Sequence, residues 1–168
     1  MKRVAEAIFY QEDDSGLFIK AEGHITAAVS VDLRELILGR LGQTPVPPIL
    51  AADLSSCEYM DSTFMGLLVG FHKRYKALTG RGLSILRPTQ ECIKLLSSLG
   101  ILKLMTVVTS PQPPSPKTWK GLRASRGPSP EILLKAHQNL SELSPENAKM
   151  FSTLQSVLEQ QVEKKDPS

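Results

Sequence analysis

The sequence predicts an α/β fold in which a mixed, largely parallel sheet is followed by a helical extension. Two strand-like segments, residues 5–10 and 17–24, flank the turn-like Q-E-D-D-S-G and predict a hairpin at the start of the sheet. From Ile49 onward strand and helix patterns alternate, which calls for right-handed crossovers between parallel strands. At about Ser110 the composition changes abruptly, so the core is expected to end there.

Each element of the predicted core follows from a local pattern. Apolar residues at helical spacing after G-H-I-T predict a first helix, which G-Q-T-P-V-P-P ends. A strongly apolar second helix follows the strand P-I-L-A-A-D-L and has a natural stop at Gly80 or Gly82. A short amphipathic third helix closes at Gly100. The predicted helices are 31–41, 62–78 and 89–99, and the remaining strands are 49–54, 83–86 and 102–108.

The C-terminal part divides into a linker and a helical hairpin. Residues 111–128 are rich in proline and basic residues and carry no negative charge, which predicts an extended, solvated linker. The alternative is that Trp119 and Leu122 pin it to a surface. Residues 129–168 contain two S-P-E segments, each with a capping serine and a proline suited to the first helical turn. We therefore predict a core domain over 1–110 and a hairpin whose apolar stripe packs on that core, on its own copy or on a partner.

Composition excludes several classes of function. The 168 residues are 41% hydrophobic and 22% charged, which is typical of a soluble globular protein. A net charge of +3 with 5% aromatic residues does not favour direct nucleic-acid binding. No apolar run approaches the about 20 residues that cross a bilayer, and no export signal is present, so we expect a cytoplasmic protein without membrane insertion. Cys57 and Cys92 fit buried thiols in a reducing compartment.

The familiar catalytic patterns are absent from the sequence. There is no phosphate-binding glycine loop, no G-x-S-x-G and no H-E-x-x-H. His24, His72 and His137 are widely separated, and His72 is expected on an exposed helix face because Lys73 and Arg74 follow it. The sequence thus predicts no metal site, no cofactor and no enzymatic activity.

One junction concentrates polar side chains beyond what local structure needs. In M-D-S-T-F-M-G, Asp61, Ser62 and Thr63 stand at the start of the second helix, where one of them is enough to cap the free N–H groups. The simple interpretation is a helix cap. The functional interpretation is a phosphoacceptor, because the helix dipole tolerates a phosphate at this end. One or both of Phe64 and Met65 beside it would then present apolar surface to a partner.

The same motif resembles D-S-[ST]-G-[LM]-G of the STAS family, the anti-sigma factor antagonists. The resemblance extends to G-H-I-T with D-L-R-E-L-I, to I-L-A-A-D-L-S-S and to R-P-T-Q-E-C-I-K-L-L-S-S-L-G-I, in the family's order, and covers roughly residues 4–109. It implies a small mixed sheet with helices packed mainly on one face. The helical extension lies outside the family pattern.

The resemblance also implies a mechanism of partner switching. The unphosphorylated protein would bind an anti-sigma factor that is also a serine kinase, and so free a sigma factor in a bacterial cell. The kinase would phosphorylate Ser62, which follows Asp61 in the motif, with Thr63 as a weaker acceptor. A separate phosphoserine phosphatase would reset the switch.

The partner surface implied by the family comprises the start of the contact helix and a neighbouring loop. Phe64, Met65 and Gly66 begin that helix, and the loop contains His24 and Thr26. Phe64 departs from the family, since many members have glycine there. His24 and Thr26 stand where many antagonists have acids, so the electrostatic surface that faces a kinase is altered.

Two other functions stay open on the sequence alone. A phosphorylation-independent scaffold or adaptor in a signalling or membrane-transport complex would use the same surface for a permanent partner. Self-association through the C-terminal helices would fit such an assembly. An enzyme ranks third, because triads assemble from residues that are distant in sequence.

Overall fold

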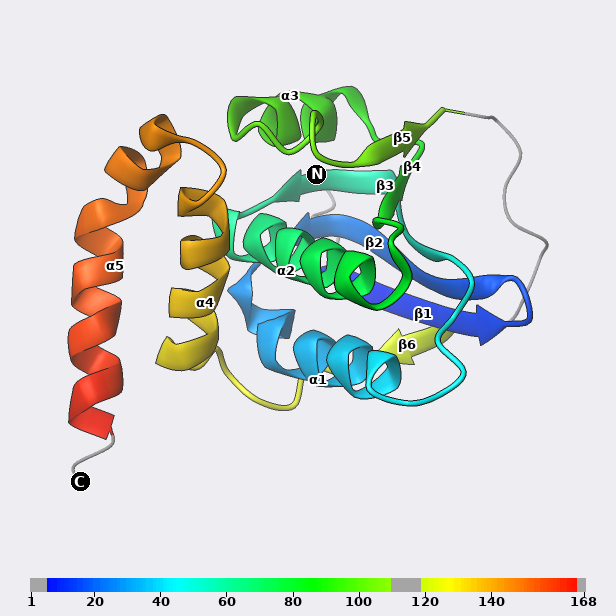
Figure 1. The fold of residues 1–168 in the computed structure, drawn as a ribbon, viewed down its shortest axis with the longest axis horizontal. Helices are drawn as coiled ribbons and strands as arrows, with labels where there is room; N and C mark the ends of the chain where they lie inside the picture. Colours follow the sequence, from blue (N-terminus) through cyan, green and yellow to red (C-terminus); the bar gives the residue numbers. More distant parts are fainter. Residues whose placement is uncertain (1–5, 110–118, 166–168) are drawn as a thin grey trace, which may run out of the picture.

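The fold is built on one six-stranded mixed sheet. The computed structural model describes residues 6–109 and 119–165, shown as coloured ribbon in Figure 1. The strand order is β5-β4-β3-β2-β1-β6. β1 and β2 form the predicted antiparallel hairpin, β2 to β5 are parallel neighbours, and β6 pairs antiparallel with β1. The strands are β1 Ala7–Asp13, β2 Gly16–Ile25, β3 Leu50–Met60, β4 Ser84–Leu86, β5 Thr106–Val108 and β6 Lys120–Leu122.

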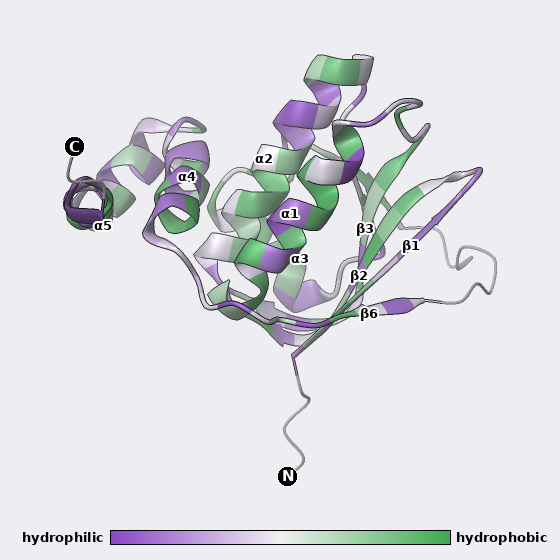
Figure 2. Cartoon of the chain, turned by 90° about the horizontal axis from the view of Figure 1, so that it is seen from below, coloured by the Kyte–Doolittle hydropathy of each residue, from purple (hydrophilic) through white to green (hydrophobic). Residues whose placement is uncertain are grey.

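Helices cover one face of this sheet. Figure 2 shows α1, α2 and α3 on the same side of the strands, with α4 and α5 farther out on that side. This arrangement confirms the expected α/β fold with helices mainly on one face. A short 3-10 turn, η1 (Ala27–Val29), leads from β2 into α1. The helices are α1 Ser30–Leu41, α2 Ser62–Thr79, α3 Gln90–Ser98, α4 Pro130–Ser141 and α5 Pro145–Lys165.

Two strand lengths differ from the prediction. β3 continues to Met60 rather than ending near residue 54, because its second half pairs with β2 across two register shifts. Only Cys57 and Met60 of that half are buried. Its other residues are exposed, so the hydrophobicity pattern of the sequence does not reveal this part of the strand. β5 is shorter than predicted, since the residues before it form a turn in which the Met105 N–H bonds the Ile101 carbonyl at 3.2 Å.

The prediction that His72 lies on the surface is wrong. Its side chain is 4% exposed and faces the segment before β4. The Leu83 N–H donates to His72 Nδ1 at 3.2 Å, so the neutral ring carries its proton on Nε2. A Cβ at Gly82 would lie 2.6 Å from His72 Nδ1, which explains glycine at this position. Burial, and then the nearby Lys76 charge, lower the pKa of His72.

The predicted helical hairpin is present and packs on the core. α4 lies against α2 and α5 lies against α4, as Figure 1 shows at the edge of the molecule. Asn147 of α5 donates to the Leu99 carbonyl at 2.9 Å, which ties the turn of the hairpin to the end of α3. Of the three destinations expected for the apolar stripe, this conformation uses the core. Met150, Leu154 and Val157 of α5 stay exposed.

The segment predicted as a linker contributes to the sheet. Its strand β6 covers the edge of β1, with Leu122 opposite Ile8. The Lys20 ammonium lies 5.9 Å from the Trp119 ring centroid, so Trp119 and Leu122 hold this part of the segment on the sheet, and the expectation of a solvated linker is wrong for residues 119–122. The core, linker and hairpin boundaries at 110 and 128 stay predictions.

The connection from β6 to α4 is also fixed, on α1. Ser125 N–H donates to Asp32 at 2.8 Å, and Arg126 contacts both Asp32 and Glu35. Burial tends to raise the pKa of Asp32, but the hydrogen bonds from Ser125 and Arg126 together lower it. The start of α4 is thereby held beside the core.

The buried neutral His72 predicts a pH-dependent stability. Its folded-state pKa is below the unfolded value of about 6.5, so its contribution is complete above that pH and is lost as the pH falls toward the folded pKa. Urea unfolding between pH 7.5 and 5 should show a smaller loss of stability for His72→Gln, whose amide oxygen can still accept from Leu83. An unchanged pH slope would contradict the role of His72.

Truncation before the hairpin tests the predicted domain division. We expect residues 1–128 to unfold cooperatively, because the complete sheet with β6 and helices α1 to α3 stay together. The unfolding temperature should fall, since Leu140 and Phe151 leave the main apolar cluster. Loss of a cooperative thermal transition, measured by circular dichroism, would show that the hairpin is part of the core.

Candidate functional site

Asp61 joins the start of α2 to the loop after β2. Its Oδ1 accepts from the Phe64 N–H at 2.9 Å, which makes it the helix cap. Its Oδ2 accepts from the Ala27 N–H at 2.8 Å, and its own N–H donates to the Ile25 carbonyl at 3.0 Å. One carboxylate therefore accepts hydrogen bonds from the first turns of both α2 and η1 and fixes the loop beside the helix.

The loop is held from its other side by Glu6. The Thr26 N–H and hydroxyl both donate to the Glu6 carboxylate, at 2.8 and 3.1 Å. Thr26 also caps η1 by accepting from the Ala28 N–H at 3.3 Å. His24 stays largely exposed, 3.4 Å from Glu58. The surface beside the start of α2 consequently has a carboxylate in Glu58, although the loop position itself has histidine.

Ser62 does not cap α2, and its side chain bonds instead to the C-terminal hairpin. Its Oγ lies 2.8 Å from Nε2 of His137 in α4. The other ring nitrogen, Nδ1, lies 2.7 Å from the Leu133 carbonyl, which can only accept a hydrogen bond. Nδ1 therefore carries a proton, and in this tautomer of the neutral ring Nε2 is the acceptor of a hydrogen bond from the Ser62 hydroxyl. His137 is 2% exposed, with the Phe151 ring edge-on at 5.2 Å between centroids.

The two helices approach closely at Gly66. A Cβ at Gly66 would lie 2.6 Å from the Ala136 carbonyl carbon and 2.8 Å from its Cβ. Asn139 Nδ2 donates to the Gly66 carbonyl at 3.3 Å, and the same amide stands against Gly70 one turn later. Small residues on both helices allow backbone contact, so the docking of α4 requires glycine at position 66.

The other residues of the motif face inward. Phe64 is fully buried and Met65 is 4% exposed, so neither presents apolar surface to a partner in this conformation. Thr63 is also 4% exposed. The helical period turns these side chains toward the core and leaves Ser62 at the seam with α4. Of the eight predicted site residues, His24 is the one that is largely exposed.

The Ser62–His137 pair has the form of a nucleophile and its base. A neutral imidazole with an oriented Nδ1–H can accept a hydroxyl proton when Oγ attacks a phosphorus atom. In the docked conformation, however, the partly buried Ser62 hydroxyl is bonded to α4, so another molecule that binds this hydroxyl has to break the bond to His137. Within the described part of the chain, no three His, Cys, Asp or Glu side chains are grouped to hold a metal ion. None of the described helices is long and apolar enough to cross a membrane.

Sequence reasoning missed the hairpin half of this site. The sequence shows His137 only as an isolated histidine, and nothing in it marks Ala136 and Asn139 as contacts of α2. The available signal was the spacing of these three residues on one face of α4, which becomes meaningful only once the opposite helix is known.

Comparison with known proteins identifies the core. The STAS domain family matches residues 7–112, well over half of the chain. The chain belongs to the STAS domain family. Among solved structures it is similar to that of the anti-sigma factor antagonist SpoIIAA in its unphosphorylated form, at 17% identity and a TM-score of 0.49. That match covers 61% of this chain and 89% of the other. No curated protein matches.

The hairpin lies outside the part of the chain that the STAS family describes. The match ends at residue 112, before β6, α4 and α5. The STAS motif of this protein is therefore covered by a segment that the family does not define.

Replacing Gly66 should release α4 from the STAS domain. In Gly66→Ala the new methyl group would meet the Ala136 backbone, although alanine favours the helical conformation of α2 by about 0.5–1 kcal/mol. Hydrogen exchange should become faster in α4 and stay unchanged in β2 and β3. Gly39→Ala in α1 is the matched control, since a Cβ there has no neighbour within 4 Å. Protection of α4 in Gly66→Ala equal to that in the control would refute the steric argument.

Proposed function

We propose that this STAS protein is a cytoplasmic bacterial regulator that switches partners under control of phosphorylation at Ser62. Its partner would be an anti-sigma factor that is also a serine kinase, with a phosphoserine phosphatase to reset the switch. The partner surface would comprise the start of α2 with the loop that contains His24 and Thr26. The observation that carries this proposal is that Asp61 caps α2 and leaves the Ser62 hydroxyl for another interaction, at the surface where α4 packs.

The hairpin would compete with the partner for this surface. α4 bonds to the Ser62 hydroxyl and covers Gly66, so a partner that needs both would bind only the fraction of molecules in which α4 has moved away. The apparent dissociation constant is then the intrinsic one divided by that fraction. A kinase would likewise reach the hydroxyl only in the open conformation.

Phosphorylation of Ser62 would change both its interaction with α4 and its interaction with a partner. Transfer of the γ-phosphoryl group of ATP to Oγ replaces a hydroxyl by a group of about −1.5 to −2 charges. Phosphorylation removes the hydroxyl proton that Ser62 shares with His137 Nε2, so the present Ser62–His137 hydrogen bond would be lost. Burying the dianion under His137 and Phe151, or under a partner without cations, would cost several kcal/mol. The start of α2 itself tolerates the phosphate because of the helix dipole.

A second function is favoured by the coverage of Ser62. If the hairpin never leaves, the protein is a phosphorylation-independent scaffold or adaptor of a signalling or membrane-transport complex. Its contacts would then lie elsewhere, and the apolar residues Met150, Leu154 and Val157 are exposed on α5 for assembly. Both functions are non-enzymatic.

Paired capture from a lysate of the native host distinguishes the two functions. Full-length wild type, Ser62→Asp and His137→Ala would serve as baits, and Ser97→Asp on the exposed side of α3 would control for added charge. We expect a protein with an ATP-binding kinase domain on wild type, more of it on His137→Ala, and none on Ser62→Asp. Mass spectrometry should also find phosphate on Ser62 in part of the recovered wild-type bait. Equal capture by all four baits, with Ser62 unmodified, would support the scaffold.

A further inference from the structure

A cleft opens between the STAS core and the hairpin, beside the contact at Gly66. Its volume is about 520 Å³, and it is lined by residues of α1, α2 and α4. This size lies within the range of small-molecule sites, about 300–1,000 Å³. Its apolar lining includes Leu38, Leu67, Phe71, Ile132 and Ala136.

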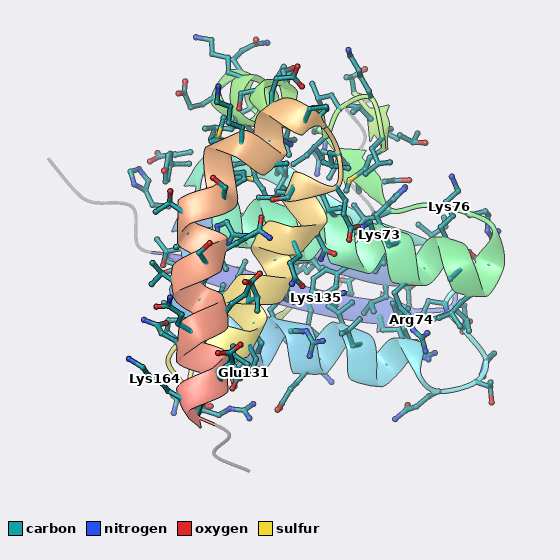
Figure 3. All side chains as sticks on the ribbon, turned by 60° about the vertical axis from the view of Figure 1, so that its left-hand side comes forward. Lys73, Arg74, Lys76, Glu131, Lys135 and Lys164 are labelled. Carbon is teal, nitrogen blue, oxygen red and sulfur yellow. The ribbon has the colours of Figure 1, made fainter. Side chains whose placement is uncertain are left out.

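Cationic side chains from all three helices converge on the same cleft. Arg34 comes from α1, Lys73 and Arg74 from α2, and Lys135 from α4, and the lining includes no acidic residue. Figure 3 shows Lys73, Arg74 and Lys135 on the neighbouring helices α2 and α4. Four positive charges around an apolar cleft repel one another unless anions reach them.

One carboxylate near the cleft balances part of this charge. Lys73 forms an ion pair with Glu142, just after α4. The hydrogen bond from Lys73 lowers the pKa of Glu142, and the more distant Lys135 charge adds to the effect. Within residues 6–109 and 119–165, Arg34, Arg74 and Lys135 form no ion pair. Three cations are thus left to face the cleft.

We propose that this cleft binds a small amphipathic anion, an organic phosphate monoester with one apolar group. The phosphate would lie among Arg34, Arg74 and Lys135, since guanidinium groups bind phosphate oxygens in pairs. The apolar group would lie on Leu67 and Ile132. Its recognition requires no phosphorylation of Ser62. A bound ligand would contact α1 and α2 of the core and α4 of the hairpin, so it would stabilise the docked conformation.

Calorimetric titration of the full-length protein tests this site. The probe is decyl phosphate below its micelle concentration, with methyl phosphate as the head group alone and decyltrimethylammonium as the same chain with the opposite charge. We expect one saturable site for decyl phosphate and at least tenfold weaker binding of the other two. Arg74→Gln with Lys135→Gln should weaken decyl phosphate binding at least tenfold. Lys94→Gln, on the exposed face of α3, should leave it unchanged.

Two further phosphates identify the source of the ligand. Tighter binding of lysophosphatidate would point to a membrane lipid, whereas tighter binding of phenyl phosphate would point to a soluble metabolite, and both outcomes support the site. The proposal is overturned if decyl phosphate does not saturate, if decyltrimethylammonium binds equally well, or if the double variant binds as wild type does. Displacement of decyl phosphate by an acidic peptide that binds more tightly would assign the cleft to a protein partner instead.

Discussion

The close approach of α4 to α2 at Gly66 is the contact on which the rest of the site depends. Because Gly66 has no side chain, the Ala136 backbone can lie directly on α2, and this places His137 at hydrogen-bond distance from Ser62. The same approach brings Lys135 to the cleft that Arg34 and Arg74 line. A side chain at position 66 would separate the helices. The backbone contact, the Ser62–His137 hydrogen bond and the position of Lys135 at the cleft would then be lost together. Gly66 of the motif is therefore needed for the docking of the hairpin, independently of any contact that it makes with a partner.

The three polar residues of the motif have separate structural roles. Asp61 satisfies N–H groups of both α2 and the loop after β2, a task worth about 1 kcal/mol for the helix cap alone. Thr63 is buried, one residue along the helix from the seam. Ser62 is left with a hydroxyl that stabilises neither the cap nor the core. Its hydrogen bond to His137 can break without loosening α2, which is the property that a switchable contact requires.

Local patterns predicted the elements, and contacts between distant residues decided the site. A cap at the start of α2, a stop at Gly80 or Gly82 and the S-P-E helix starts depend on neighbours within a few residues, so the sequence predicts them. The structure then selects Asp61 as the cap and Gly80 as the stop. The length of β3 depends on pairing with β2, and the burial of His72 depends on the approach of Gly82 and Leu83. The position of α4 on the core depends on complementarity between α2 and α4, which are about 70 residues apart in the sequence. Periodicity shows that α4 has an apolar face, but it does not say which surface that face meets.

The strength of the hairpin docking determines whether the Ser62 surface can act as a switch. The contacts that hold α4 and α5 include an exposed ion pair, Lys73 with Glu142, and such pairs add only about 0–1 kcal/mol. The buried bonds of Asn139 to Gly66 and Asn147 to Leu99 add about 1 kcal/mol each. If the open state were populated at about 1%, a partner would bind about a hundredfold more weakly than to the exposed surface. An anion in the cleft would lower that population further, and phosphate on Ser62 would raise it. A charge in the cleft and a charge on Ser62 would thus act in opposite directions on one equilibrium.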